Sequence, residues 1–152
     1  MQAIYLDMDG TIADLYSQNN WLDCLHASDA TPYRKASPLV DMERLARVLN
    51  LAQGMGIALG IISWVSKGSS LEYAKEVRAA KKEWLARHLP NVAFDDVRIV
   101  NYGRMKQTVA KYPNGLLIDD SPFVCASWGK ENTLDAKNPG WLDELARMVE
   151  AL

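Results

Sequence analysis

The sequence predicts an α/β fold with a parallel sheet. Short apolar runs alternate along the chain with stretches of helical periodicity, and two of these runs end in a pair of acidic residues. Strands that alternate with helices are typical of parallel sheets with right-handed crossovers. We therefore expect a three-layer, Rossmann-like sheet flanked by helices. The chain has neither an internal repeat nor a long linker, so residues 1–152 are predicted to form one domain.

The first half of the chain carries two strand patterns and one clear helix pattern. The run "AIYL" (residues 3–6) indicates a short strand that ends at an acidic turn. Ser37-Pro38 predicts a helix start, because proline is favoured at the first helical position, and Gly54 predicts its end. The run "GIALGIIS" (residues 56–63) is continuously apolar, as expected for a strand buried on both faces.

The second half continues the alternation. Ser69 to Glu72 resembles a capping box that begins a helix, and Leu89-Pro90 predicts the end of that helix. Asn138-Pro139 predicts the start of a final helix. Between them we expect strands at "VRIV" (97–100), "LLIDD" (116–120) and "NTLDA" (132–136), with a brief helical stretch at 106–111.

Composition and charge exclude several functional classes. The net charge is -2 with both signs interspersed, so neither a nucleic-acid-binding stripe nor a polybasic membrane segment is indicated. The longest apolar stretch, residues 57–62, is too short to span a bilayer. Strand-like residues begin almost at Met1, which predicts a cytoplasmic protein without a signal peptide. Cys24 and Cys125 form no CxxC pair, so neither a disulfide framework nor a zinc site is expected.

Residues with chemical potential follow the predicted strands. The carboxyl ends of parallel strands meet at one edge of a sheet, where ligands bind. Each residue taken alone is better explained as a turn or helix-cap residue. Together, four carboxylates without cysteine or histidine predict a site for a hard cation, Mg²⁺ first. The residues expected to converge are Asp7, Asp9, Ser63, Trp64, Lys106, Asp119 and Asp120.

These segments resemble the motifs of a known enzyme superfamily. "DMDGT" (7–11), "IIS" (61–63), Lys106 and "LLIDD" resemble, in order, the four motifs of the haloacid dehalogenase-like superfamily of phosphohydrolases. More narrowly, "MKQTVAKYPNGLLIDD" (105–120) is similar to the small 5'(3')-deoxyribonucleotidase branch, although the run and its following loop are longer here. The resemblance implies a Mg²⁺-dependent phosphomonoesterase that works through an aspartyl-phosphate intermediate.

The resemblance also implies a role for most of these residues. Asp7 is the expected nucleophile, and Asp9 the acid that protonates the leaving oxygen and later activates water. The Ser63 hydroxyl and the Trp64 N–H are expected to hold phosphoryl oxygens, beside the Lys106 ammonium. Mg²⁺ is expected to be held by Asp7, the Asp9 carbonyl and Asp119, with Asp120 either orienting the site or reaching the metal through water.

The roles of Gly10 and Thr11 in the "DMDGT" turn, and the identity of the catalytic lysine, need separate arguments. The turn at Gly10 is expected to let Asp9 reach a different atom from Asp7. Thr11 either braces this turn beside the substrate or simply caps the following segment. Lys67 and Lys111 compete with Lys106 for the catalytic role. Position relative to the strand ends favours Lys106.

The segment after the first strand predicts the substrate class. Residues 13–37 are expected to be irregular and to form a small cap over the site. Trp21 and the other cap aromatics can stack a nucleobase, or Trp21 and Tyr33 merely pack the cap onto the core. Arg34 can meet a phosphate or sugar oxygen. A small phosphorylated substrate, with nucleoside 5'-monophosphates as the first choice, is the leading hypothesis.

Two alternatives remain beside that hypothesis. One is a phosphatase of a larger substrate, such as a polynucleotide end or a phosphoprotein, and the other is a non-catalytic binding module on the same fold. A small cap leaves an open site, which favours the larger substrate, whereas the missing basic patch disfavours polynucleotides. The acid cluster disfavours a mere scaffold. The sequence leaves open whether the chain forms a homo-oligomer.

Overall fold

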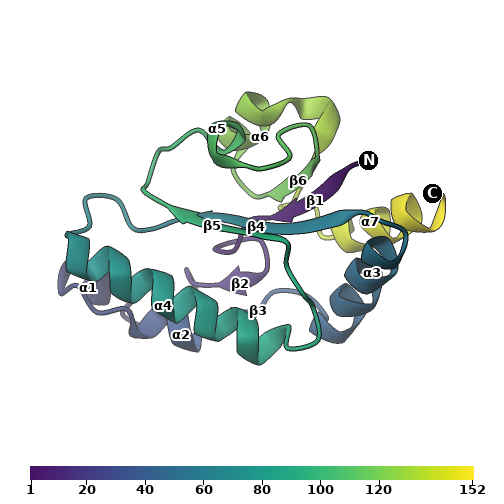
Figure 1. Ribbon diagram of the computed structural model, residues 1–152. Helices are drawn as coiled ribbons and strands as arrows, with labels where there is room; N and C mark the ends of the chain where they lie inside the picture. Colours follow the sequence, from purple (N-terminus) through teal and green to yellow (C-terminus); the bar gives the residue numbers. More distant parts are fainter.

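The computed structural model describes residues 1–152 and has a five-stranded parallel sheet at its centre. Figure 1 shows this sheet nearly edge-on between two layers of helices. The predicted α/β class and its three-layer, Rossmann-like arrangement are therefore confirmed. In the order in which they lie across the sheet, the strands are β5 (Asp96–Val100), β4 (Ala58–Trp64), β1 (Ala3–Leu6), β6 (Leu116–Asp119) and β7 (Thr133–Asp135).

Helices cover both faces of the sheet because both faces are apolar. Along β1 the side chains alternate between two buried clusters: Ile4 and Leu6 belong to the larger one, and Tyr5 belongs to the opposite one. The helices on the first face are α3 (Met42–Gly54), α4 (Leu71–His88) and α7 (Trp141–Glu150), and those on the second face are α5 (Lys106–Val109) and α6 (Pro122–Trp128) (Figure 1).

The strand order brings three carboxyl ends together. Strand β1 pairs with β4 on one side and with β6 on the other, and Leu6 lies opposite both Ile61 and Ile118. The next residue, Asp7, continues this arrangement, since its N–H donates to the Ile118 carbonyl over 2.9 Å. The acidic turn after β1 therefore lies between the ends of β4 and β6.

The predicted helix start at Ser37-Pro38 is wrong. These residues form strand β3 (Ser37–Pro38), which pairs antiparallel with β2 (Ala13–Asp14). Helix α3 begins later, where the Asp41 side chain caps it by accepting from the Arg44 N–H at 3.0 Å. A serine–proline pair suits an edge strand as well as a helix start, because proline lacks the N–H that either position leaves unused.

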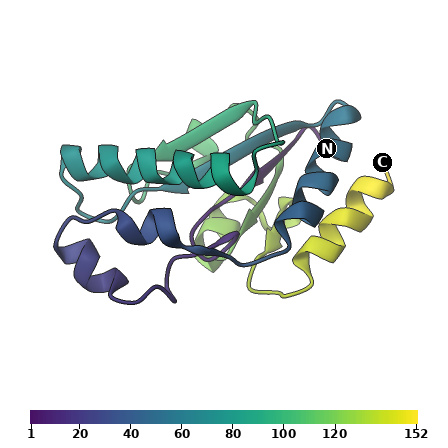
Figure 2. The same cartoon turned by 90° about the horizontal axis from the view of Figure 1, so that it is seen from below.

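The cap segment is more regular than predicted. Besides β2, residues 13–37 contain helices α1 (Trp21–His26) and α2 (Thr31–Lys35). Figure 2 shows both short helices beside the long helix α4, and α2 packs on α4. Each is too short to show a helical hydrophobic period, which is why neither helix was predicted. Helix α6 and the 3₁₀ turn at Lys130–Asn132 were also not predicted.

The other predicted elements are confirmed, with small shifts at their ends. Helix α4 is capped by Ser70, whose hydroxyl accepts from the Tyr73 N–H at 3.1 Å, rather than by Ser69. Helix α5 ends at Val109, and the final helix starts at Trp141 rather than directly after Pro139. No helix of the chain combines the length and the apolar character that crossing a bilayer would require.

Candidate active site

A cavity of about 370 Å³ opens at the carboxyl edge of the sheet. Its wall on the sheet side carries every strand-end residue that the sequence singled out. Residues of the cap segment, most of them apolar or aromatic, complete the lining. The residues from the sheet side are Asp7, Asp9, Ser63, Trp64, Lys106, Asp119 and Asp120, and those from the cap are Leu15, Tyr16, Trp21, Leu25 and Tyr33.

Lys106 joins the acidic ends of β1 and β6. Its ammonium, only 3% exposed, donates to Asp7 Oδ1 at 2.8 Å and to Asp119 Oδ2 at 2.6 Å. Burial alone would lower the pKa of Lys106, but the charges of Asp7 and Asp119 outweigh burial, so its pKa lies above the usual value. The preference for Lys106 over its rivals is thus matched by its position. Lys111 does not line the cavity, and Lys67 lies near the Tyr102 ring.

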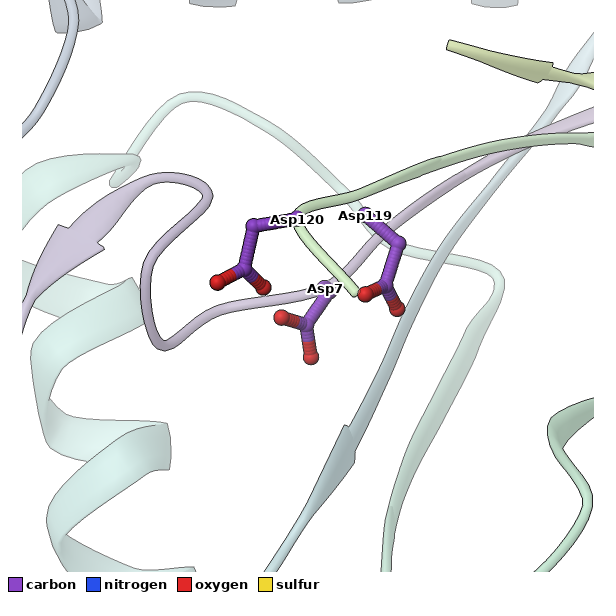
Figure 3. Close-up of side chains that lie close together, drawn as sticks. All are labelled: Asp7, Asp119 and Asp120. Carbon is purple, nitrogen blue, oxygen red and sulfur yellow. The ribbon is translucent and has the colours of Figure 1, made fainter. Parts of the chain in front are cut away.

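Three carboxylates converge beside this lysine. Figure 3 shows the side chains of Asp7, Asp119 and Asp120 grouped at the ends of β1 and β6, and their oxygens lie within 4.8 Å of one another. Burial, and then the charge of Asp7, raise the pKa of Asp119 to about 7 and that of Asp120 to about 6. Both carboxyl groups therefore hold a proton to higher pH than an exposed aspartate does.

Gly10 allows the turn after β1 to approach Asp120. Its φ is +78°, and a Cβ at this position would lie 2.3 Å from Asp120 Oδ2. A larger residue would therefore push Asp120 away from Asp7. The neighbouring Thr11 is buried, and its hydroxyl lies 3.3 Å from Asp7 Oδ2, to which it donates. Neither Gly10 nor Thr11 lines the cavity; Gly10 lies against Asp120, and Thr11 donates to Asp7.

The donor set fits a hard divalent cation. Four carboxylates, those of Asp7, Asp9, Asp119 and Asp120, line the cavity, and only two buried ammonium groups pair with them: Lys106, which also lines the cavity, and Lys81 behind Asp9. When all of them are ionised, two negative charges remain without a partner. Carboxylate oxygens without a soft ligand match Mg²⁺. Asp7, Asp119 and Asp120 are the residues that would hold the ion.

Mg²⁺ is expected to stabilise the protein more at about pH 8 than at about pH 5. The raised pKa values of Asp119 and Asp120 mean that the metal-free fold binds protons more tightly than the unfolded chain does, so its stability falls as pH rises from about 4 towards 7. A cation replaces these protons. At 100-fold excess over the Kd, the gain is about 2.7 kcal/mol, roughly 5–10 °C in Tm.

Thermal melts with and without Mg²⁺ at both pH values measure this effect. The matched variant is Asp119→Asn, which removes one of the three clustered carboxylates and should reduce the Mg²⁺ shift at pH 8. A shift of equal size at both pH values, or one that survives in Asp119→Asn, would contradict binding at this cluster.

A second buried lysine, Lys81 of α4, was missed by sequence reasoning. Its ammonium is 1% exposed and donates to Asp9 Oδ2 at 2.7 Å, to Ser63 Oγ at 2.8 Å and to the Trp64 carbonyl at 2.7 Å. The pKa of Asp9 is nevertheless raised, because its burial and the charge of Asp7 outweigh the opposing effect of Lys81. The available signal was a lysine at helical spacing from the apolar residues Val77 and Trp84.

The two tryptophans that line the cavity contact different parts of the chain. The Trp64 indole Nε1 donates to the Arg104 carbonyl at 2.9 Å, and its ring lies 5.5 Å from Lys106 Nζ, so Trp64 fastens the loop that leads to Lys106. Trp21 lines the cavity and packs edge-to-face on Tyr16, with 5.4 Å between ring centroids.

Arg34 is not brought to the cavity. Its Nε pairs with Glu83 Oε2 at 2.9 Å, which ties α2 to the outer side of α4. The predicted contact between Arg34 and a substrate oxygen therefore has no counterpart in this geometry.

A scan against protein-family models and searches of curated proteins and of solved structures return no match for this chain. The motif resemblance therefore remains a prediction.

Proposed function

We propose that this chain is a haloacid dehalogenase-like phosphomonoesterase that transfers the phosphoryl group first to Asp7 and then to water. One observation carries the proposal: Asp7 lies in the cavity wall, bound by the Lys106 ammonium that also binds Asp119. An anionic nucleophile needs such neighbouring positive charge to approach an anionic phosphate ester. A purely structural ion pair would not need to line an open cavity.

In the first step, an Asp7 carboxylate oxygen forms a bond to phosphorus while the ester oxygen leaves with its bonding electron pair. Asp9 gives that oxygen a proton, so the alcohol departs neutral. The raised pKa of Asp9 supports this role, because it keeps the proton available nearer neutral pH. Lys106 and Thr11 both donate to the Asp7 carboxylate, which suits an ionised nucleophile.

In the second step, a water molecule attacks phosphorus and the bond from Asp7 to phosphorus breaks. Asp9, now ionised, takes a proton from the water, which restores both acids to their starting forms. Ser63 lines the cavity at the end of β4, where its hydroxyl can donate to a phosphoryl oxygen. Mg²⁺, when held by Asp7, Asp119 and Asp120, would offset negative charge on the group being transferred.

The cap wall favours a planar leaving group. Aromatic side chains from both sides of the cavity surround the space next to the acids, and base–aromatic stacking contributes roughly 1–3 kcal/mol per base. This supports a nucleoside 5'-monophosphate as the substrate. The aromatic residues concerned are Tyr16, Trp21, Tyr33, Trp64 and Tyr102.

A substrate panel with Mg²⁺ tests the proposed function. p-Nitrophenyl phosphate should be turned over, and nucleoside 5'-monophosphates should show a kcat/KM at least about 10-fold above that of glycerol 2-phosphate, the equivalent of 1.4 kcal/mol from one stacked base. Faster hydrolysis of phosphopeptides would instead assign a protein substrate. Complete inactivity towards all of these esters would favour the non-catalytic binding module.

A further inference from the structure

Lys81 occupies a position that ordinary helix packing would give to an apolar residue. It belongs to the stripe of α4 that faces the sheet, four residues after Val77 and three before Trp84, both of which are fully buried. A charge at such a position carries a desolvation cost that a leucine or methionine would avoid. Its retention therefore calls for a role beyond holding α4 against the sheet.

The ammonium group of Lys81 uses all of its donors on the candidate active site. Its three N–H groups match three acceptors, namely Asp9 Oδ2, Ser63 Oγ and the Trp64 carbonyl. The Tyr33 ring lies 5.3 Å from the ammonium. Lys81 itself does not line the cavity, so it acts on the residues that do.

The contact with Lys81 determines which way the Ser63 hydroxyl can donate. A serine oxygen accepts through its lone pairs and donates one hydrogen. Because Ser63 Oγ accepts from Lys81 and makes no other side-chain hydrogen bond, its hydrogen is available to an acceptor in the cavity that Ser63 lines. A phosphoryl oxygen is such an acceptor.

The same contact separates the two oxygens of Asp9. Oδ2 is bound to Lys81 at 2.7 Å, which leaves Oδ1 as the oxygen available to carry a proton to and from the reacting groups. Without Lys81 the Asp9 carboxyl group could rotate, and its burial would have no compensating charge. A misplacement of a reacting group by about 1 Å can lower the rate about 100-fold.

We infer that Lys81 is a positioning residue for phosphoryl transfer, which fixes Asp9 for proton transfer and aims the Ser63 hydroxyl at the phosphoryl group. This inference rests on the proposed phosphatase function and adds a residue outside the motifs that suggested that function. If Lys81 positions Asp9 in this way, removal of Lys81 should weaken protonation of the leaving group.

Two substrates whose leaving groups differ in their need for a proton test this prediction. Thymidine 5'-monophosphate releases an alkoxide that needs a proton, whereas p-nitrophenolate leaves without one. In Lys81→Met, kcat/KM on thymidine 5'-monophosphate should fall about 100-fold or more, and kcat/KM on p-nitrophenyl phosphate should fall at least about 10-fold less, because kcat/KM reports only the steps up to release of the leaving group. The adjacent exposed residue provides the matched control, Lys82→Met, which should behave like the native protein on both substrates.

Combining the change with Asp9→Asn identifies the route of the effect. In the Asp9→Asn background no proton transfer remains to be lost, so Lys81→Met should lower kcat/KM on both substrates by the same factor. If Lys81→Met is not recovered folded, Lys81→Arg gives the same comparison, since it keeps the charge but cannot place its planar donors on all three acceptors.

Three results would overturn the inference: equal losses of kcat/KM on both substrates in Lys81→Met, unchanged activity in that variant, or discrimination that persists without Asp9. Each of them requires an active native protein. A native protein that hydrolyses neither ester would instead remove the proposed function and this inference together.

Discussion

Asp7→Asn is expected to lower kcat on every phosphomonoester by at least about 10⁴-fold. The amide keeps the shape of the carboxylate but cannot attack phosphorus. The fold should remain intact, because the change removes the Asp7 charge, which contributes to the raised pKa values of Asp119 and Asp120. Steady-state kinetics on p-nitrophenyl phosphate, combined with a thermal melt of the same sample, measures both parts of this expectation.

The matched control for that variant is Asp143→Asn. Asp143 lies on α7 with its side chain 60% exposed and pairs with Arg44, far from the cavity lining. An exposed pair of this kind contributes little to stability, so kcat and Tm should both stay close to native values. Near-normal turnover in Asp7→Asn would assign the nucleophile to another residue.

Lys106→Met should have the second largest effect. It removes the only ammonium that contacts Asp7 and Asp119, and kcat should fall about 10³-fold, as when a preorganised donor is removed from an active site. Breaking a buried pair also costs about 3–5 kcal/mol of unfolding free energy. Because the acids left behind can be protonated, the loss of stability should be smaller at about pH 5 than at about pH 8.

Two other lysines serve as controls for Lys106. Lys67 lines the cavity, and Lys111 lies 5.2 Å from the Tyr112 ring outside it. Lys111→Met should be native-like, and Lys67→Met should affect KM more than kcat. If Lys67→Met or Lys111→Met abolished turnover while Lys106→Met retained it, the catalytic cation would be misassigned.

The sheet and the strand-end residues could be predicted because parallel-sheet topology relates them directly. An apolar run followed by acids places those acids at one edge, which is why Asp7, Asp119 and Lys106 were found together. Ser37 misled the prediction because its signal also fits an edge strand. The short cap helices lacked enough turns to show a period.

Contacts between distant elements account for the residues that sequence reasoning misplaced. Arg34 was expected to contact the substrate, but its side chain forms an ion pair with Glu83 of α4 instead. Lys81 was passed over because lysines on helices are ordinarily solvated, and only the packing of α4 against the sheet shows that this one is buried beside Asp9 and Ser63.

Chemical trapping of the aspartyl-phosphate intermediate identifies the residue that attacks phosphorus. Rapid quenching during turnover, followed by borohydride reduction, converts an aspartyl-phosphate into homoserine, which peptide mass spectrometry locates in the sequence. If Asp7 is the nucleophile, homoserine should appear at position 7 and not at position 9. Homoserine at any other aspartate, or phosphate release with no trapped residue at all, would contradict the claim that Asp7 attacks phosphorus.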